Sequence, residues 1–364
     1  MAVDRRFLVN VDWVMLGVAL VLAAIGVAMV RSATHTGANS GLYLKQIFLV
    51  CLGLVGLVAA LAVDYRRLAD RAPLLYVGAV AALVYVLRFG PTIASTRRWL
   101  MVAGIQIQPS ELAKLVAAIL VAKVFAESRK ESLGLADIAG PGLAVGVLAL
   151  LIAAEPDLGT AFCLVPLFLT VAFLAGLRMR AVLAVFVGLA LVAALWWQFM
   201  AQPYQKDRVY NFLEPGRDLK KAGYQRNQSQ IAVGSGGLTG KGYKNGSQSQ
   251  LGYLPARHTD FIFSVLAEEM GFLGVVVVLG LYLLVLWRAL ETAQLARDRV
   301  GAFLAAGIAS VLAFQVVYNV AMVAGLVPVK GLPLPLMSYG GASILSTFLG
   351  IGLIINVRMR RFAN

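Results

Sequence analysis

Long, continuous apolar runs separated by short polar segments make up most of this chain. A helix needs roughly 17 to 25 residues to cross a ~30 Å hydrocarbon core, and we identify ten runs of about this kind. They lie approximately at residues 12–31, 43–63, 73–88, 111–126, 139–154, 160–176, 181–200, 272–289, 301–323 and 340–357. Backbone groups in lipid must be satisfied within their own segment, and these runs do not alternate with polar residues, so the pattern excludes a β-barrel. The sequence predicts an all-α, polytopic membrane protein of about ten transmembrane helices, with residues 1–364 forming a single domain.

The composition agrees with this architecture, and the positions of the charges orient it. The chain has 364 residues, of which 60% are hydrophobic and 14% charged, and a formal net charge of +14. If the first helix starts inside, sixteen Lys and Arg residues fall on inner segments and six on short outer segments. The positive-inside rule then places both termini in the cytoplasm. Basic residues that mark cytoplasmic loops form no continuous patch, so we expect no nucleic-acid partner.

One polar segment is much longer than the others and separates the seventh run from the eighth. It covers residues 201–271 and is extracytoplasmic by the same topology. Tyrosines are spaced through it, whereas disordered linkers are poor in aromatic residues. We therefore expect this large loop to fold over the outer mouth of the bundle, partly as short helices such as 224–233.

A glycine-rich run within this loop, GSGGLTGKG at 234–242, invites comparison with phosphate-binding loops. A Walker A loop ending at Lys241 would need Gly at 235 and Ser or Thr at 242, where the chain has Ser235 and Gly242. Two interpretations stay open. The backbone N–H groups and Lys241 could hold a phosphate or sugar, or the run could be a flexible turn.

The motif QPSELAK at 108–114 places charge at the start of the fourth run. Pro109 and Ser110 are helix-start signals, with Ser110 expected as the N-cap. Glu111 and Lys114 are three residues apart and so share one helix face. They could line an outward-opening site for an anionic substrate, or form an ion pair that ties helices together. Just upstream, two cations and an amphipathic ring lie at the same outer level: Arg97, Arg98 and Trp99.

Several other acidic positions have structural explanations. Asp157, in the turn EPDLGT at 155–160, can cap the sixth helix. Glu268 and Glu269 are expected as capping residues or as partners of the loop. Between the ninth and tenth runs, three prolines in the segment 325–343 forbid a helix and predict a rigid extended connection.

The segment ARHTDFIF at 256–263 places Arg257, His258 and Asp260 directly before an apolar run. A helix cap would need only Asp260, so the neighbouring charges favour another role. A carboxylate at an apolar boundary can have its pKa shifted by burial or by a nearby cation, as an acid–base catalyst requires. Asp260 is therefore a candidate catalytic residue, and His258 and Thr259 are candidate substrate contacts.

Taken together, these motifs resemble the SEDS family (shape, elongation, division and sporulation), and within it the RodA-type elongation branch. The resemblance covers essentially the whole chain. Its blocks are RRWL at 97–100, QPSELAK, PDLGTA at 156–161, GYQRNQSQIAVGSGGLTGKG at 223–242, SQSQLGYLPARHTDFIFSVLAEEMG at 247–271 and PVKGLPLPLMSYGGAS at 328–343. The chain departs from the family pattern at Lys330, where a small hydroxyl residue is usual.

This resemblance implies a peptidoglycan glycosyltransferase that polymerises lipid II, an undecaprenyl-diphosphate-linked disaccharide-pentapeptide. It would act in the bacterial cytoplasmic membrane, on the extracytoplasmic side, within an elongation complex that includes a class B penicillin-binding protein. Asp260 falls on the acidic position regarded as catalytic in the family. The developing negative charge of the leaving diphosphate needs cations, for which the candidates are Arg97, Arg98, Lys114, Arg208, Lys241 and a divalent metal, Mg²⁺ or Mn²⁺.

Two other functions are compatible with a ten-helix bundle. A lipid II flippase would need a polar path through the bilayer, whereas this chain concentrates its polar residues on the outer half. A scaffold for cell-wall enzymes would need no essential carboxylate. The cysteines and histidines add no chemistry of their own, because Cys51 and Cys163 lack a CxxC spacing and only His35 and His258 are present.

Overall fold

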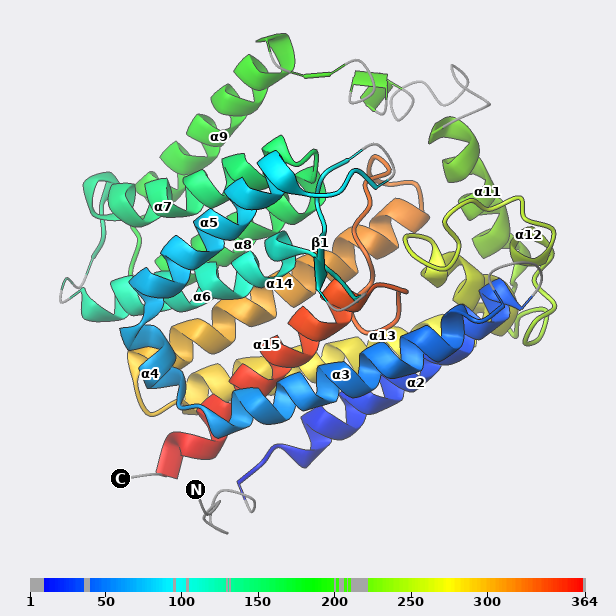
Figure 1. Ribbon diagram of the computed structural model, residues 1–364, viewed down its shortest axis with the longest axis horizontal. Coiled ribbons are helices and arrows are strands. Elements are labelled where there is room, and N and C mark those ends of the chain that lie inside the picture. Colours follow the sequence, from blue (N-terminus) through cyan, green and yellow to red (C-terminus); the bar gives the residue numbers. More distant parts are fainter. Residues whose placement is uncertain are drawn as a thin grey trace.

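The computed structural model describes residues 10–35, 40–93, 96–102, 105–128, 130, 132–199, 201–202, 206–207, 209–210 and 222–362. Long helices dominate this part of the chain (Figure 1). They are α2 (Trp13–Thr34), α3 (Leu42–Ala62), α5 (Ala72–Phe89), α6 (Pro109–Glu127), α7 (Leu135–Ala154), α8 (Leu158–Leu174), α9 (Met179–Phe199), α13 (Ile262–Leu295), α14 (Arg299–Val323) and α15 (Gly341–Met359). These ten helices correspond one by one to the ten apolar runs, which confirms the predicted fold class.

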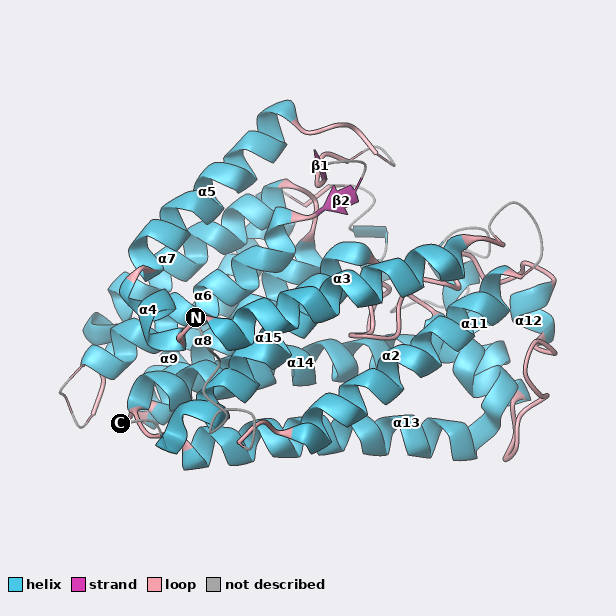
Figure 2. Ribbon diagram, turned by 60° about the horizontal axis from the view of Figure 1, so that its bottom comes forward, coloured by secondary structure: helices cyan, strands magenta, loops and turns pink. Residues whose placement is uncertain are grey.

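Shorter elements connect the long helices. They are α4 (Tyr65–Asp70), α11 (Ala222–Ser235), α12 (Ser247–Gln250), the 3₁₀ helix η1 (Arg360–Phe362), and the antiparallel strands β1 (Leu100–Val102) and β2 (Ile105–Ile107). Figure 2 shows how little strand the described chain contains. The predicted short helix at 224–233 lies inside α11 and is confirmed.

Eight of the long helices are apolar and long enough to span a membrane. The helix α8 is shorter, and α6 carries the charged pair near its start. Side chains fix several helix starts, since Asp12, Asp157 and Asp298 each accept a hydrogen bond from the first turn of the helix that follows. The expected cap at Ser110 was wrong. Pro109 occupies the first helical position, where its missing N–H costs nothing, and the N-cap is Gln108.

The helices α14 and α15 form the centre of the bundle, and α9 lies at its outside. Nearly all of α15 is buried against α3, α6, α13 and α14, which explains its wealth of small residues at contact positions. In α9, by contrast, Ala181 is the buried residue and the remaining described side chains are at least partly exposed. In Figure 1 this helix runs along the upper left edge of the molecule. Its apolar surface is suited to contact with lipid.

The helix α13 is two helical pieces joined at a break, and this break organises the large loop. Gly271 has non-helical backbone angles, φ 65° and ψ −165°, so the predicted span beginning at 272 starts where the second piece starts. The first piece, 262–270, belongs to the region assigned to the loop. Segment 237–242 closes the break: the N–H groups of 241 and 242 donate to the carbonyls of Glu268 and Glu269, and those of 272 and 273 donate to the carbonyls of 237 and 238.

The segment 324–340 between α14 and α15 contains no helix, as its prolines predict. It returns into the bundle, where Leu332, Leu334, Leu336 and Met337 are buried. Tyr282 of α13 donates to the carbonyl of Pro335, and Gln46 of α3 donates to that of Ser338 (3.1 Å). This re-entrant segment therefore forms a fixed wall at one end of the bundle.

Candidate active site

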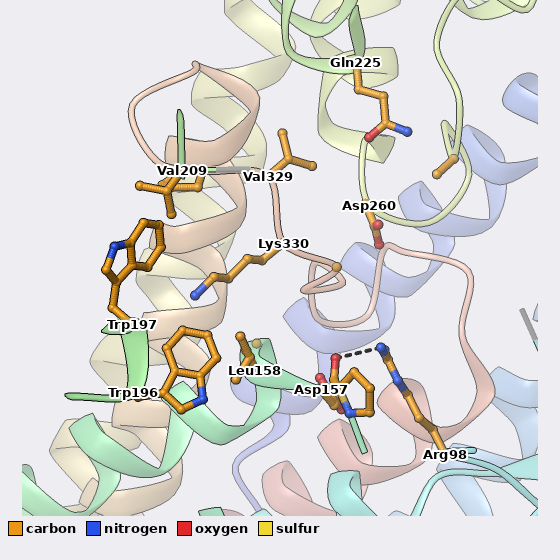
Figure 3. A pocket seen from close by; sticks show the side chains of 15 residues that line it. Arg98, Asp157, Leu158, Trp196, Trp197, Val209, Gln225, Asp260, Val329 and Lys330 are labelled. Atoms are coloured by element: carbon orange, nitrogen blue, oxygen red, sulfur yellow. Dashed lines mark hydrogen bonds between the residues drawn. The ribbon is translucent and has the colours of Figure 1, made fainter. Parts of the chain in front are cut away.

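A cavity of about 310 Å³ opens at the end of the bundle that carries the re-entrant segment. Residues from separate parts of the sequence line it: Arg98, residues 156–159, Trp196, Trp197, Val209, Gln225, Ala256, Asp260 and residues 328–331. Figure 3 shows their side chains around one open space. The cavity brings together two motifs that lie far apart in the sequence, EPDLGT and ARHTDFIF.

Asp260 lies at the end of the large loop, immediately before α13. The N-cap residue of α13 is Phe261, and no side chain makes a capping hydrogen bond there, so the capping alternative for Asp260 does not apply. Asn319 of α14 donates through Nδ2 to the carbonyl oxygens of Asp260 (3.0 Å) and Leu332 (2.8 Å). Gly331 packs closely against the carboxylate, since a Cβ there would lie 3.4 Å from Asp260 Oδ2. Asn319 thus couples the position of Asp260 to the re-entrant segment.

The residues before Asp260 fasten the loop to the same segment. Ser338 donates through Oγ to the carbonyl of Thr259 (2.6 Å), and the N–H of Tyr339 donates to the carbonyl of His258 (2.9 Å). The rings of His258 and Tyr339 meet edge to face at 5.8 Å, and Arg257 donates to the carbonyl of Ser249. Burial and the charge of Arg257 lower the pKa of His258, so its imidazole is neutral at pH 7. Arg257, His258 and Thr259 do not line the cavity and act on the conformation of the loop.

Among the described residues, two cationic side chains line the cavity, Arg98 and Lys330. Arg98 donates through Nε to the carbonyl of Glu155 (2.8 Å) and through Nη2 to that of Pro156 (2.7 Å). The Lys330 ammonium lies 3.8 Å from the ring centre of Phe162 on α8. Lys330 was noted in the sequence only as a departure from a motif, although a charged residue in an otherwise apolar re-entrant segment was the signal that could have placed it here.

The turn between α7 and α8 forms another wall. The Asp157 carboxylate caps α8 by accepting from the N–H of Thr160 (3.2 Å), as predicted, and also accepts from Gln108 Nε2 (2.7 Å) and Ser110 Oγ (3.2 Å). It therefore joins α6 to α8. Trp196, Trp197 and Gln225 complete the lining and were not singled out from the sequence, because nothing local distinguishes them from other interfacial residues.

The buried pair Glu111 and Lys114 lies away from this cavity. Lys114 Nζ is 3.0 Å from Glu111 Oε1, both side chains are almost fully buried, and Ser346 of α15 donates to Glu111 Oε2 (2.6 Å). The space beside them measures about 20 Å³, room for a single water molecule. This geometry favours the ion pair that ties helices together over the outward-opening substrate site.

The other predicted contacts are also separate from the cavity lining. Arg97 is exposed and donates to the carbonyl of Arg88 (3.1 Å), and Trp99 is half-buried in the same connection. Lys241 pairs with the buried Glu268 (2.8 Å) and donates to Ser235 and Ser247, so Glu268 is a loop partner as expected. Arg208 lies outside the described residues.

A resident metal would need a cluster of ligands, and the described residues hold no group of three or more His, Cys, Asp and Glu side chains suited to one. Mg²⁺ in proteins is commonly held by one or two carboxylates together with substrate phosphates. The lining of the cavity supplies two carboxylates for such an arrangement, Asp157 and Asp260.

Comparison with known proteins identifies relatives along almost the whole chain. The family model described as cell cycle protein, FTSW_RODA_SPOVE, matches residues 6–362. The peptidoglycan glycosyltransferase MrdB of Escherichia coli K12 is 37% identical over 356 residues, 97% of this chain and 95% of that protein. The peptidoglycan glycosyltransferase RodA of Treponema pallidum is 31% identical over 427 residues, 96% of this chain and 98% of that protein.

Solved structures show the same relationship in three dimensions. A chain from work on polymerization and crosslinking by a peptidoglycan synthase complex superposes with a TM-score of 0.84 at 34% identity, covering 97% of this chain and 99% of that chain. The rod shape determining protein RodA of Thermus thermophilus superposes with a TM-score of 0.73 at 31% identity, covering 97% and 98% of the two chains. The protein described here belongs to the FtsW, RodA and SpoVE family.

Proposed function

We propose that this protein is a peptidoglycan glycosyltransferase that polymerises lipid II, with Asp260 as the general base. The observation that carries the proposal is the position of the Asp260 carboxylate: it lines a cavity at one end of an apolar helical bundle, together with a guanidinium and an ammonium group. The names of the relatives support the reaction class. A charged glycolipid with a hydrophobic anchor matches a cavity that combines charged groups with an apolar lining at the end of membrane-embedded helices.

In the proposed reaction, the Asp260 carboxylate accepts the proton from the 4-hydroxyl of the N-acetylglucosamine of the acceptor. The hydroxyl oxygen forms a bond to C1 of the N-acetylmuramic acid of the donor, and the bond from C1 to the diphosphate oxygen breaks with inversion of configuration. The electron pair of that bond leaves with undecaprenyl diphosphate. Of the cations suggested by the sequence that the structure describes, Arg98 lines the cavity, and its charge favours the polyanionic substrate there.

A divalent cation remains part of the proposal. Mg²⁺ or Mn²⁺ held mainly by the substrate phosphates would supply charge neutralisation to the leaving diphosphate and would leave Asp260 available as the base. Removal of divalent ions with a chelator, followed by assay of polymer formation, tests this requirement.

The flippase alternative is not favoured. A flippase needs a polar path through the bundle, but the buried charged pair Glu111 and Lys114 borders only a space of about 20 Å³. The central helices α14 and α15 around it are the most buried candidate spans of the described chain.

The orientation and the partners belong to the proposal as well. We propose that the cavity faces the extracytoplasmic side and that both termini are cytoplasmic, because the Lys and Arg residues of the short connections lie mostly at the end opposite the cavity. The ends of α2 and α15 meet there, with Arg358 3.3 Å from Asp12. A class B penicillin-binding protein within the elongation complex is the proposed partner, supported by the similarity to a chain from a peptidoglycan synthase complex.

The decisive experiment supplies purified protein with lipid II in detergent, with and without the penicillin-binding partner. One well-placed general base contributes about 10²- to 10⁴-fold to a rate. Asp260→Asn should therefore reduce glycan polymer by at least about 100-fold while the thermal unfolding midpoint stays close to that of the wild type. Polymer formation by the Asn variant at the wild-type rate would refute the role of Asp260. Transfer of lipid II across vesicles without polymer would refute the enzyme.

A further inference from the structure

We infer that Lys330 binds the diphosphate of the lipid-linked donor and neutralises its charge as it leaves. The inference rests on the proposed function and adds a substrate contact to it. The inference stands on the place of Lys330 in the cavity.

Lys330 and the Asp260 carboxylate line the same cavity. Lys330 directly precedes Gly331, the residue that packs against the Asp260 carboxylate. Figure 3 shows the Lys330 side chain extending away from Asp260, toward Trp196 and Trp197. The re-entrant segment thus carries both Gly331, which packs against Asp260, and Lys330, whose ammonium extends across the same cavity.

An inverting displacement fixes where the leaving diphosphate lies relative to the base. The attacking oxygen and the leaving oxygen lie on opposite faces of the anomeric carbon, so a cation that serves the leaving diphosphate must lie across the cavity from the base. The ammonium of Lys330 satisfies this requirement. Arg98 lies on another side, beside Asp157 (Figure 3), where two of its donors are already bonded to backbone carbonyls at 2.8 and 2.7 Å.

The ammonium group of Lys330 is chemically suited to bind a phosphate. Lys carries a compact point charge with three donors on a flexible stem, and it is a common ligand of phosphates. Its ammonium rests 3.8 Å from the ring centre of Phe162. A cation–π contact at a partly exposed site contributes only about 0.5–1 kcal/mol, less than a charge-assisted hydrogen bond to a phosphate contributes.

Lys330 faces a wall of the cavity formed by two tryptophan rings. Trp196 and Trp197 stand near the end of α9, whose preceding side chains Leu191, Val192 and Leu195 are highly exposed. Indole rings at the end of an apolar, lipid-exposed helix are typical of the membrane–water interface. A diphosphate at Lys330 would therefore lie where a polyprenyl chain can continue along an apolar surface.

The test measures binding of undecaprenyl diphosphate to detergent-solubilised protein, followed by tryptophan fluorescence, since Trp196 and Trp197 line the cavity. Loss of one charge-assisted hydrogen bond weakens binding about tenfold or more. Lys330→Gln should therefore raise the Kd for the diphosphate about tenfold and for undecaprenyl monophosphate by less. Lys330→Arg, which keeps a positive charge, should retain most of the wild-type affinity. This result would show that Lys330→Gln loses affinity through the missing charge and not through misfolding. The matched control is Lys244→Gln, which removes an ammonium 5.6 Å from the Tyr243 ring, outside the cavity lining.

An unchanged Kd in Lys330→Gln, or an equal loss for the diphosphate and the monophosphate, overturns the inference. A parallel lipid II assay separates this result from the proposed function. If the wild type polymerises lipid II while Lys330→Gln retains full kcat/KM, the function stands and the role of Lys330 fails. If the wild type makes no polymer, the proposed function fails, and the difference in diphosphate affinity still decides the role of Lys330.

Discussion

Glu155 is a fully buried carboxylic acid in the turn beside the active-site cavity, and neither of its oxygens has a hydrogen-bond partner among the described residues. Burial, together with the charge of Asp157, raises the pKa of Glu155 to about 8, while the charge of Arg98 acts in the opposite direction. The group is therefore protonated at neutral pH. A neutral Glu155 adds no negative charge beside Arg98, which suits a site for a polyanionic substrate.

This protonation predicts a pH-dependent stability. A carboxyl whose pKa is raised on folding binds a proton that the unfolded chain releases, so stability falls as pH rises from the ordinary pKa of 4.5 to about 8. Glu155→Gln has no proton to lose and should raise the thermal unfolding midpoint at pH 8 by about 2–4 °C for each kcal/mol regained, with no gain at pH 4. Scanning calorimetry across this range checks the slope. The exposed Glu127→Gln is the matched control, and a gain equal at both pH values would contradict the explanation.

Single residues also show how much of the site was readable from the sequence. Asp260 and Asp157 stand out because each is a carboxylate at an apolar boundary, and the local sequence shows that boundary. The roles of Asn319 and Lys330 could not be read from the sequence, because they depend on which segment packs against these residues. Glu111, Lys114 and Lys241 were expected to contact substrate, but each is engaged by an oppositely charged partner in the fold, and a one-dimensional pattern does not distinguish a paired ion from a free one.

At the scale of elements, the glycine-rich run at 234–242 is explained by its close backbone packing against α13. A Cβ on Gly236 would lie 2.0 Å from the carbonyl oxygen of Ala267, and one on Gly240 would lie 2.1 Å from that of Glu269. The glycines therefore allow the loop backbone to approach α13 closely enough to satisfy the polar groups freed at Gly271. The N–H groups of residues 241 and 242, which a phosphate would need, donate to helix carbonyls instead.

Gly236→Ala should consequently displace the loop from α13 and disturb the segment that leads to Asp260. We expect a loss of kcat of at least about tenfold and a destabilisation of about 1–3 kcal/mol, typical of overpacking. Gly234→Ala, two residues earlier in α11, has nothing within 4 Å of its added Cβ and should be neutral or slightly stabilising. Polymer assays and thermal melts of both variants decide the matter. Equal behaviour of the pair would show that the close approach is unimportant.

The long helices were predictable because lipid imposes one rule on every span: about twenty apolar residues with their hydrogen bonds made internally. The first piece of α13, residues 262–270, was not predicted as a helix. It adjoins a span, and its two acidic residues, Glu268 and Glu269, make it resemble a loop. Both acids are buried by partners distant in sequence, Glu269 by Ser32 (2.6 Å) and Glu268 by Lys241 (2.8 Å). Such long-range pairing is absent from any local window.

On the scale of the whole molecule, polar groups gather at the two ends of the bundle and serve different purposes. The end with the cavity carries Asp260, Arg98 and Lys330. The other end carries ion pairs that hold helix termini together: Asp12 at the start of α2 bonds to Arg288 of α13 (3.0 Å) and lies 3.3 Å from Arg358 of α15. We call these ion pairs of Asp12 with Arg288 and Arg358 the clamp. Because α13 and α15 flank the segments that carry Asp260 and Lys330, the clamp holds together the helices that position the cavity end.

Asp12→Asn tests the clamp without removing the helix cap, since the Asp12 side chain also accepts from the N–H of Met15 (3.0 Å) and Asn caps equally well. The change leaves two guanidinium groups facing a neutral amide, which should cost about 1–3 kcal/mol. The control, Asp137→Asn, breaks the exposed pair with Lys130 and should change stability little. We expect the melting midpoint of Asp12→Asn to fall while kcat at low temperature is preserved, because the clamp lies at the opposite end from the cavity. A large loss of kcat in fully folded protein would instead show that the two ends are coupled through α13 and α15.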